Sequence, residues 1–94
     1  MIFNVKSKLK NANKKSKIEA IQYNVENLND VMDFVGFGNA LWNPTSEELW
    51  IRNYIGDCIV KNGWYVIKRK DVGLCVVQSL VFDKVYEKCE QYED

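Results

Sequence analysis

A series of short β-rich segments in the second half of the chain limits its fold more than any other feature. Two of these segments, residues 58–61 and 64–69, flank Asn62-Gly63, a dipeptide that tolerates the positive φ values of a type I′ hairpin turn. A second turn signal at residues 70–73 leads into the next β-rich segment. Because connections this short join antiparallel neighbours, we expect consecutive strands to form a meander.

Helical periodicity flanks this strand-rich region on both sides. Asn27 is a suitable N-cap for a helix whose apolar residues recur at helical spacing, and Gly36 and Gly38 are expected to stop that helix. Its apolar residues are Leu28, Val31, Met32 and Val35. A final helix is expected to begin with Ser79 as its N-cap and to run toward the C-terminus. Its apolar stripe would consist of Leu80, Val81, Val85 and Cys89.

The remaining β-rich segments complete the fold prediction. Residues 18–25 alternate in part, so the odd-numbered side chains from Ile21 to Val25 should share one face of a strand. Residues 49–53 predict another strand, after which Gly56-Asp57 is expected to make a turn. We therefore expect an α+β fold with two helices and a small, mainly antiparallel sheet of four to five strands, in the order β-α-β-β-β-β-α.

Charge is distributed unevenly along a chain whose formal net charge is zero. The first 17 residues hold six lysines and no acidic residue, a charge of +6, so the remainder carries −6. We expect residues 1–17 to form a basic flexible arm or a hairpin, and residues 18–94 to form a single α+β domain. The sequence lacks the ~18 consecutive apolar residues of a membrane span and the apolar core of a signal peptide, which predicts a cytoplasmic protein.

The chain contains three cysteines and no histidine. Without histidine, Ser-His-Asp and Cys-His constellations are excluded, as are histidine-ligated metals. Cys58, Cys75 and Cys89 lack the paired spacing of a zinc site, so we expect reduced, largely buried thiols. Asp30 and Asp33 leave a paired-carboxylate scheme open, although such a pair is usually a solvated helix face. The sequence therefore predicts no catalytic residue, metal or cofactor, and a protein that is not an enzyme.

Two groups of side chains are candidates for binding a partner. Exposed aromatic residues would anchor a protein or stack on a nucleotide base, and basic residues would hold phosphates. The candidates are Trp42, Trp50, Trp64 and Tyr65 among the aromatic residues, and Arg52, Lys68, Arg69 and Lys70 among the basic ones. Trp64 and Tyr65 are adjacent and should point to opposite faces of a sheet. Either one of these faces is open to water, or both belong to a thick core.

Several motifs resemble those of a family of small phage and prophage proteins. Residues 17–34 are similar to the opening of that family, residues 56–61 to its Gly-Asp-x-hydrophobic strand, and residues 82–87 to its closing Phe-x-x-x-Tyr-Glu helix. This chain has Cys58 where the family usually has Trp, and its segment between the last two motifs is several residues longer. The resemblance implies a phage accessory protein expressed in a bacterial cytoplasm, and it transfers no activity.

Three functions remain open on these grounds. The first is stoichiometric binding, as an inhibitor of a host bacterial defence or nuclease component, with an acidic body that mimics nucleic acid toward a basic groove. The second is sequestration of a small ligand such as a nucleotide signal, and the third is nucleic-acid binding through the Lys-rich arm. We expect no contact with membranes, and the edge strands of a small meander favour a homodimer.

Overall fold

The computed structural model describes residues 2–8, 18–53, 56–70 and 73–89. Its strands are β1 (Phe3–Ser7), β2 (Ile18–Gln22), β3 (Ala40–Asn43), β4 (Glu48–Asn53), β5 (Gly56–Val60), β6 (Tyr65–Arg69), β7 (Gly73–Val77) and β8 (Tyr86–Cys89). Its helices are α1 (Leu28–Val35) and α2 (Ser79–Val85), with the short 3-10 helices η1 (Val25–Asn27) and η2 (Phe37–Asn39) on either side of α1. The expected α+β class is confirmed.

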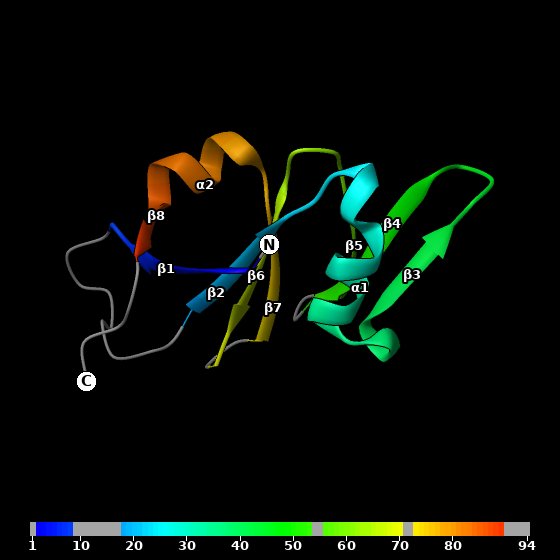
Figure 1. Ribbon diagram of the computed structural model, residues 1–94, viewed down its shortest axis with the longest axis horizontal. Helices are drawn as coiled ribbons and strands as arrows, with labels where there is room; N and C mark the ends of the chain where they lie inside the picture. The colour runs from blue at the N-terminus through cyan, green and yellow to red at the C-terminus, as the bar shows by residue number, and fades with distance from the viewer. Residues whose placement is uncertain (1, 9–17, 54–55, 71–72, 90–94) are drawn as a thin grey trace.

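The described strands form two antiparallel sheets instead of one. The larger sheet has the order β7-β6-β2-β1-β8, and the smaller is the meander β3-β4-β5. Figure 1 shows α2 and β8 at one end of the long axis and the β3–β5 sheet at the other. The expected single sheet of four to five strands is therefore wrong, as is its element order. Among the described residues the order is β-β-α-β-β-β-β-β-α-β.

The Asn62-Gly63 turn departs most from expectation. It does not close a hairpin, because β5 before it pairs with β4 while β6 after it pairs with β2. Gly63 has a φ of 90°, whereas Asn62 lacks the positive φ that a type I′ turn needs at both central positions. Hydrogen bonds from Gly63 N to Tyr23 O (2.7 Å) and from Tyr23 N to Trp64 O (2.8 Å) direct the chain onto β2. The turn therefore joins the two sheets.

The N-terminal strand belongs to the same sheet as the rest of the larger core. β1 lies between β2 and β8, and Val5 in its centre is fully buried. β1 and β2 pair as antiparallel neighbours, and most of the chain between them, residues 9–17, lies outside the described residues. No helix within the described ranges is long and apolar enough to cross a membrane.

Three local assignments are corrected near the strands of the smaller sheet and α1. Gly56 and Asp57, expected in a turn, open β5, and the φ of 127° at Gly56 is one that glycine adopts without strain. Val25 does not share a face with Ile21, because β2 ends at Gln22 and Val25 is 64% exposed in η1. The Asn27 side chain donates to Gln22 O (2.7 Å) and accepts from Asn24 N (2.9 Å), so it completes the capping box of η1, whose N-cap is Asn24, and it makes no cap bond to α1.

The final helix is shorter than expected and turns a different face to the core. Ser79 is its first residue instead of its N-cap, and the chain leaves the helix at Tyr86 to form β8 beside β1. Leu80 and Val81, expected in the apolar stripe, are 76% and 46% exposed, whereas Phe82 is buried. The helix ends after two turns, where β8 begins to pair with β1. The face of α2 that carries Phe82 is the one that packs against the sheet.

The larger sheet is covered on both faces at its strands β2 and β6. One face packs against α1 and the inner face of the smaller sheet in a cluster of buried residues: Ile21, Tyr23, Val31, Phe34, Val35, Leu49, Ile51, Val60 and Val66. The other face packs under α2 in a second cluster: Val5, Ile18, Ala20, Ile67 and Phe82. The smaller sheet, in contrast, contributes only one of its faces to a described cluster.

Candidate functional site

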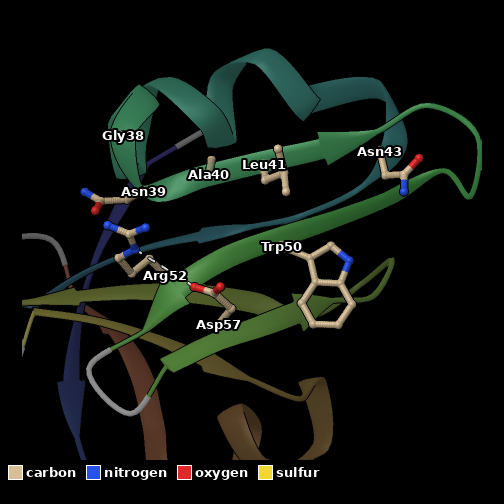
Figure 2. Close-up of a pocket in the computed structure, with 8 residues that line it drawn as sticks. All are labelled: Gly38, Asn39, Ala40, Leu41, Asn43, Trp50, Arg52 and Asp57. Atoms are coloured by element: carbon tan, nitrogen blue, oxygen red, sulfur yellow. Dashed lines mark ion pairs between the residues drawn. The ribbon is translucent and has the colours of Figure 1, made fainter.

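The outer face of the β3–β5 sheet is the candidate functional site. Alternation along β4 defines it, because Leu49 and Ile51 are fully buried against the core while Trp50 and Arg52 point the other way. Figure 2 shows this face, which neither described hydrophobic cluster covers and at whose edge η2 contributes Gly38 and Asn39. An exposed sheet face that carries a Trp and an Arg has the side chains most common in binding hot spots.

An apolar row runs across the three strands of this face. Leu41, Trp50 and Ile59 lie directly opposite one another in the registers β3–β4 and β4–β5. Leu41 is 67% exposed, and Trp50 and Ile59 are half-buried. Directly opposed side chains have Cβ atoms about 5 Å apart, so the three form one continuous surface. We call these three residues the apolar row.

An ion pair lies next to the apolar row. Arg52 and Asp57 are opposite each other in β4 and β5, with Nε 4.0 Å from Oδ1, and both side chains are well exposed. An exposed pair at this distance contributes at most about 1 kcal/mol to stability. Either charge can therefore turn to a partner at little cost to the fold.

A shallow hollow of about 390 Å³ opens on the same face. It is lined by Gly38, Asn39, Ala40, Leu41, Asn43, Trp50, Arg52 and Asp57 (Figure 2). The volume is within the range of small-molecule sites. The indole of Trp50 offers a stacking surface and Arg52 a cation, but Asp57 beside Arg52 partly neutralises that cation.

Of the eight candidate binding residues, Trp50 and Arg52 are the two that come together on this face. Trp42 and Trp64 are half-buried and pack against the first cluster. Trp42 does so from the inner face of the smaller sheet, where it lies opposite Leu49. Tyr65 packs in the second cluster, its ring stacked 3.8 Å from that of Phe82. Trp64 and Tyr65 therefore do face opposite clusters, and both ends of this pair belong to a thick core.

The basic residues at 68–70 do not form one surface. Lys68 Nζ donates to Phe34 O (2.9 Å) and lies 5.1 Å from the Phe34 ring centroid, so it satisfies a carbonyl at the end of α1. Arg69 lies on the opposite face of the larger sheet, opposite Ile18, and Lys70 is exposed in the following turn. These three cations point in different directions, which weakens the case for a shared phosphate site.

The motif that closes the chain has a structural explanation. Phe82 is the buried anchor of α2, and Tyr86 stacks on it with ring centroids 5.6 Å apart. Glu87 Oε1 lies 3.3 Å from Lys6 Nζ, and Lys8 Nζ donates to Asp83 O (2.6 Å). The described lysines of the basic segment therefore contact the α2–β8 end of the molecule.

Two tyrosines among the described residues have shifted pKa values. Burial, with a smaller effect of Asp83, raises the pKa of Tyr65, and burial with a smaller effect of Glu47 raises that of Tyr23. Both phenols are therefore protonated at neutral pH. Asp30 and Asp33 are both exposed on α1. Within the described ranges no three His, Cys, Asp or Glu residues cluster as metal ligands, and the three cysteines are free and half-buried.

Comparisons with known proteins return no match, whether with family models, curated proteins or solved structures. The candidate site is therefore identified from its geometry alone. Sequence reasoning missed Leu41 and Ile59, because β3 is only four residues long and the expected turn at Gly56-Asp57 hid the register of β5. Alternation in Leu49-Trp50-Ile51-Arg52 is the signal that could have identified the open face.

Proposed function

We propose that this protein is a phage accessory protein that acts by stoichiometric binding in the bacterial cytoplasm, as an inhibitor of a host defence or nuclease component. One observation carries the proposal of binding: the open outer face of the β3–β5 sheet. Its centre is the apolar row, and its rim holds the Arg52–Asp57 pair and the amide of Asn43. An apolar centre with a polar rim is the usual anatomy of a protein interface.

Trp50 is the expected anchor of this interface. It lies on the central strand, so its backbone is held on both sides by β3 and β5. An aromatic side chain on a rigid element loses little conformational freedom when a partner covers it. Arg52, two residues along the same strand, can exchange Asp57 for an acidic group or carbonyl of the partner.

The class of target is inferred from charge and from the resemblance to small phage proteins. Residues 18–94 carry a net charge of −6, and Glu26, Asp30 and Asp33 are exposed along η1 and α1, where there is no basic residue. An acidic surface of this kind attracts proteins with basic, nucleic-acid-binding grooves. Nucleases and defence proteins that bind nucleic acid have such grooves.

Site-specific photo-crosslinking in bacterial cells tests this proposal. A benzophenone amino acid replaces Trp50 in one variant and Leu80 in the other, because Leu80 is a comparably exposed apolar residue on α2. We expect one discrete adduct, with one target per chain, from position 50 and none from position 80. Equal labelling at both positions, or no adduct at position 50, contradicts the proposal. An adduct with a protein that is neither a defence component nor a nuclease contradicts the assigned target class alone.

A second candidate function is sequestration of a nucleotide, favoured by Trp50 and Arg52 lining the same hollow of about 390 Å³. The base would stack on Trp50 and a phosphate would bind Arg52 after Asp57 moves away. Thermal shifts across a panel of nucleotides test this function. We expect stabilisation by at least one nucleotide that is lost in both Trp50→Ala and Arg52→Ala, and a flat response would exclude it.

The third candidate function is nucleic-acid binding through the Lys-rich arm. Deleting the arm is not a suitable test of it. Removing residues 1–16 would remove β1, an inner strand of the larger sheet. Replacing Lys10, Lys14, Lys15 and Lys17 with Gln leaves β1 intact. If the arm binds nucleic acid, this variant should lose affinity and show a smaller dependence on salt concentration.

A further inference from the structure

The free edge of the smaller sheet is the strand β3, residues Ala-Leu-Trp-Asn. Among the described elements, β4 is the one with which β3 makes extensive contacts. The other sheet edges differ from it: β8 carries Glu87 and Lys88, β5 carries Asp57, and β7 lies against β4 and β5. Proteins normally protect edge strands with charges, proline or a covering element. β3 itself has neither a charged residue nor a proline.

We propose that β3 pairs with β3 of a second copy of this chain, antiparallel and around a twofold axis, to form a continuous six-stranded sheet. A twofold axis perpendicular to the sheet makes the contact self-complementary and closes it at two copies. It also keeps the outer faces of both copies on the same side. The edge of β3 that faces away from β4 then gains backbone hydrogen bonds from an identical edge.

The side chains of β3 select the register. Residues that face each other across an antiparallel pair lie on the same side of the sheet, so the axis must pass through a residue. With the axis at Leu41, Leu41 meets Leu41 of the second copy on the outer face, and Ala40 meets Trp42 on the inner face. A small residue opposite a large one packs without a clash.

The neighbouring register is less favourable. With the axis at Trp42, the half-buried Trp42 side chains of the two copies would oppose each other, and Leu41 would meet the polar Asn43. Ala40 would then meet Pro44, which has no N–H group to donate across the pair. The Leu41-centred register is therefore the one that we assign.

The pairing extends the apolar row into six residues: Ile59, Trp50 and Leu41 followed by Leu41, Trp50 and Ile59 of the second copy. The outer face stays open, so the dimer and a bound partner are compatible. The dimer does not depend on the proposed inhibitory function, because it requires no partner.

Sedimentation of the purified full chain over a wide concentration range tests the dimer. We expect a monomer–dimer equilibrium that weakens at least tenfold in Leu41→Lys, which places two cations against each other on the axis. Leu80→Lys is the matched control, because Leu80 is as exposed as Leu41 but lies on α2, and it should leave the equilibrium unchanged. A wild-type protein that is monomeric throughout, or a dimer that Leu41→Lys does not weaken, overturns the proposal.

Oxidation of variants that add one cysteine to the three native ones tests the register. Leu41→Cys should form a disulfide between two copies at position 41, identified by peptide mass spectrometry, and Leu80→Cys should not. A dimer without the 41–41 disulfide overturns the assigned register. Because both experiments use the isolated protein, their outcome is separate from that of crosslinking through Trp50.

Discussion

The two sheets of this protein differ in how many of their faces are covered. In the larger sheet, β2 and β6 have consecutive buried residues, such as Val66 and Ile67, because α2 lies on one face and α1 with the smaller sheet on the other. In the smaller sheet, β4 alternates between the buried Leu49 and Ile51 and the outward Trp50 and Arg52. This difference indicates where the molecule gains stability and where it can bind, because β2 and β6 are covered on both faces, whereas neither described cluster covers the outer face of the smaller sheet.

The largest expected effect is on the covered sheet. Phe82→Ala should lower the free energy of unfolding by about 3–5 kcal/mol, because it removes the buried ring that anchors α2 and stacks on Tyr65. Urea denaturation followed by circular dichroism measures the change. Leu80→Ala, on the exposed side of the same helix, should stay within about 0.5 kcal/mol of the wild type. Similar losses in the two variants would mean that α2 docks by its other face.

The two faces of the smaller sheet can be compared directly. Ile51→Ala should cost about 2–5 kcal/mol, because Ile51 is fully buried against the first cluster. Leu41→Ala, on the outer face at the free edge, should cost no more than about 0.5 kcal/mol, measured at low protein concentration where the dimer is dissociated. If Leu41→Ala were as costly as Ile51→Ala under these conditions, the outer face would be covered within one chain.

A smaller effect is expected where the larger sheet meets α1. Lys68→Met should lower the free energy of unfolding by about 1 kcal/mol, because it removes the hydrogen bond to Phe34 O while keeping most of the side-chain length. Lys70→Met is the control, since Lys70 is exposed in a turn. Equal stability of the two variants would show that Lys68 does not hold the end of α1. Lys68 would then be available to bind a partner.

The smallest effect at neutral pH is expected at Tyr65. Burial raises its pKa in the folded protein above the unfolded value of about 10. Folding thus favours the neutral phenol. Its contribution to the free energy of unfolding is fully present below pH ~10 and is lost as the pH rises through the pKa of the folded protein. Tyr65→Phe should leave stability near pH 7 almost unchanged and reduce its loss in alkaline solution. Denaturation at pH 7 and at pH 11 measures the difference, and an unchanged alkaline loss would contradict the argument unless Tyr23, which is shifted in the same direction, accounts for it.

Local patterns in the sequence were sufficient for part of the fold. The spacing of Val31 and Val35 identified α1, and its expected stop is seen at Gly36. The β-rich run at residues 49–53 identified β4, and residue type alone placed Trp50 and Arg52 among the binding candidates. These predictions succeeded because each depends on the periodicity of a single element or on one residue's backbone preference.

Other features depended on contacts that a local pattern does not contain. Asn62-Gly63 has the composition of a hairpin turn, yet pairing of β6 with β2 sends the chain to the other sheet. The residues of β8 suit a helix, but pairing with β1 satisfies their backbone in extended form. Lys68, Arg69 and Lys70 are adjacent in sequence and point apart in space.

The sequence by itself determined the α+β class, the positions of α1 and β4, and the opposite directions of Trp64 and Tyr65, because side-chain periodicity of a helix or strand is a local property. The tertiary structure decided that there are two sheets, that β2 and β6 of the larger one are covered on both faces, and that the described residues leave the outer face and the β3 edge of the smaller one open. Strand partners are chosen by competition among distant segments for the same backbone hydrogen bonds and apolar surface, and no single segment encodes the result of that competition.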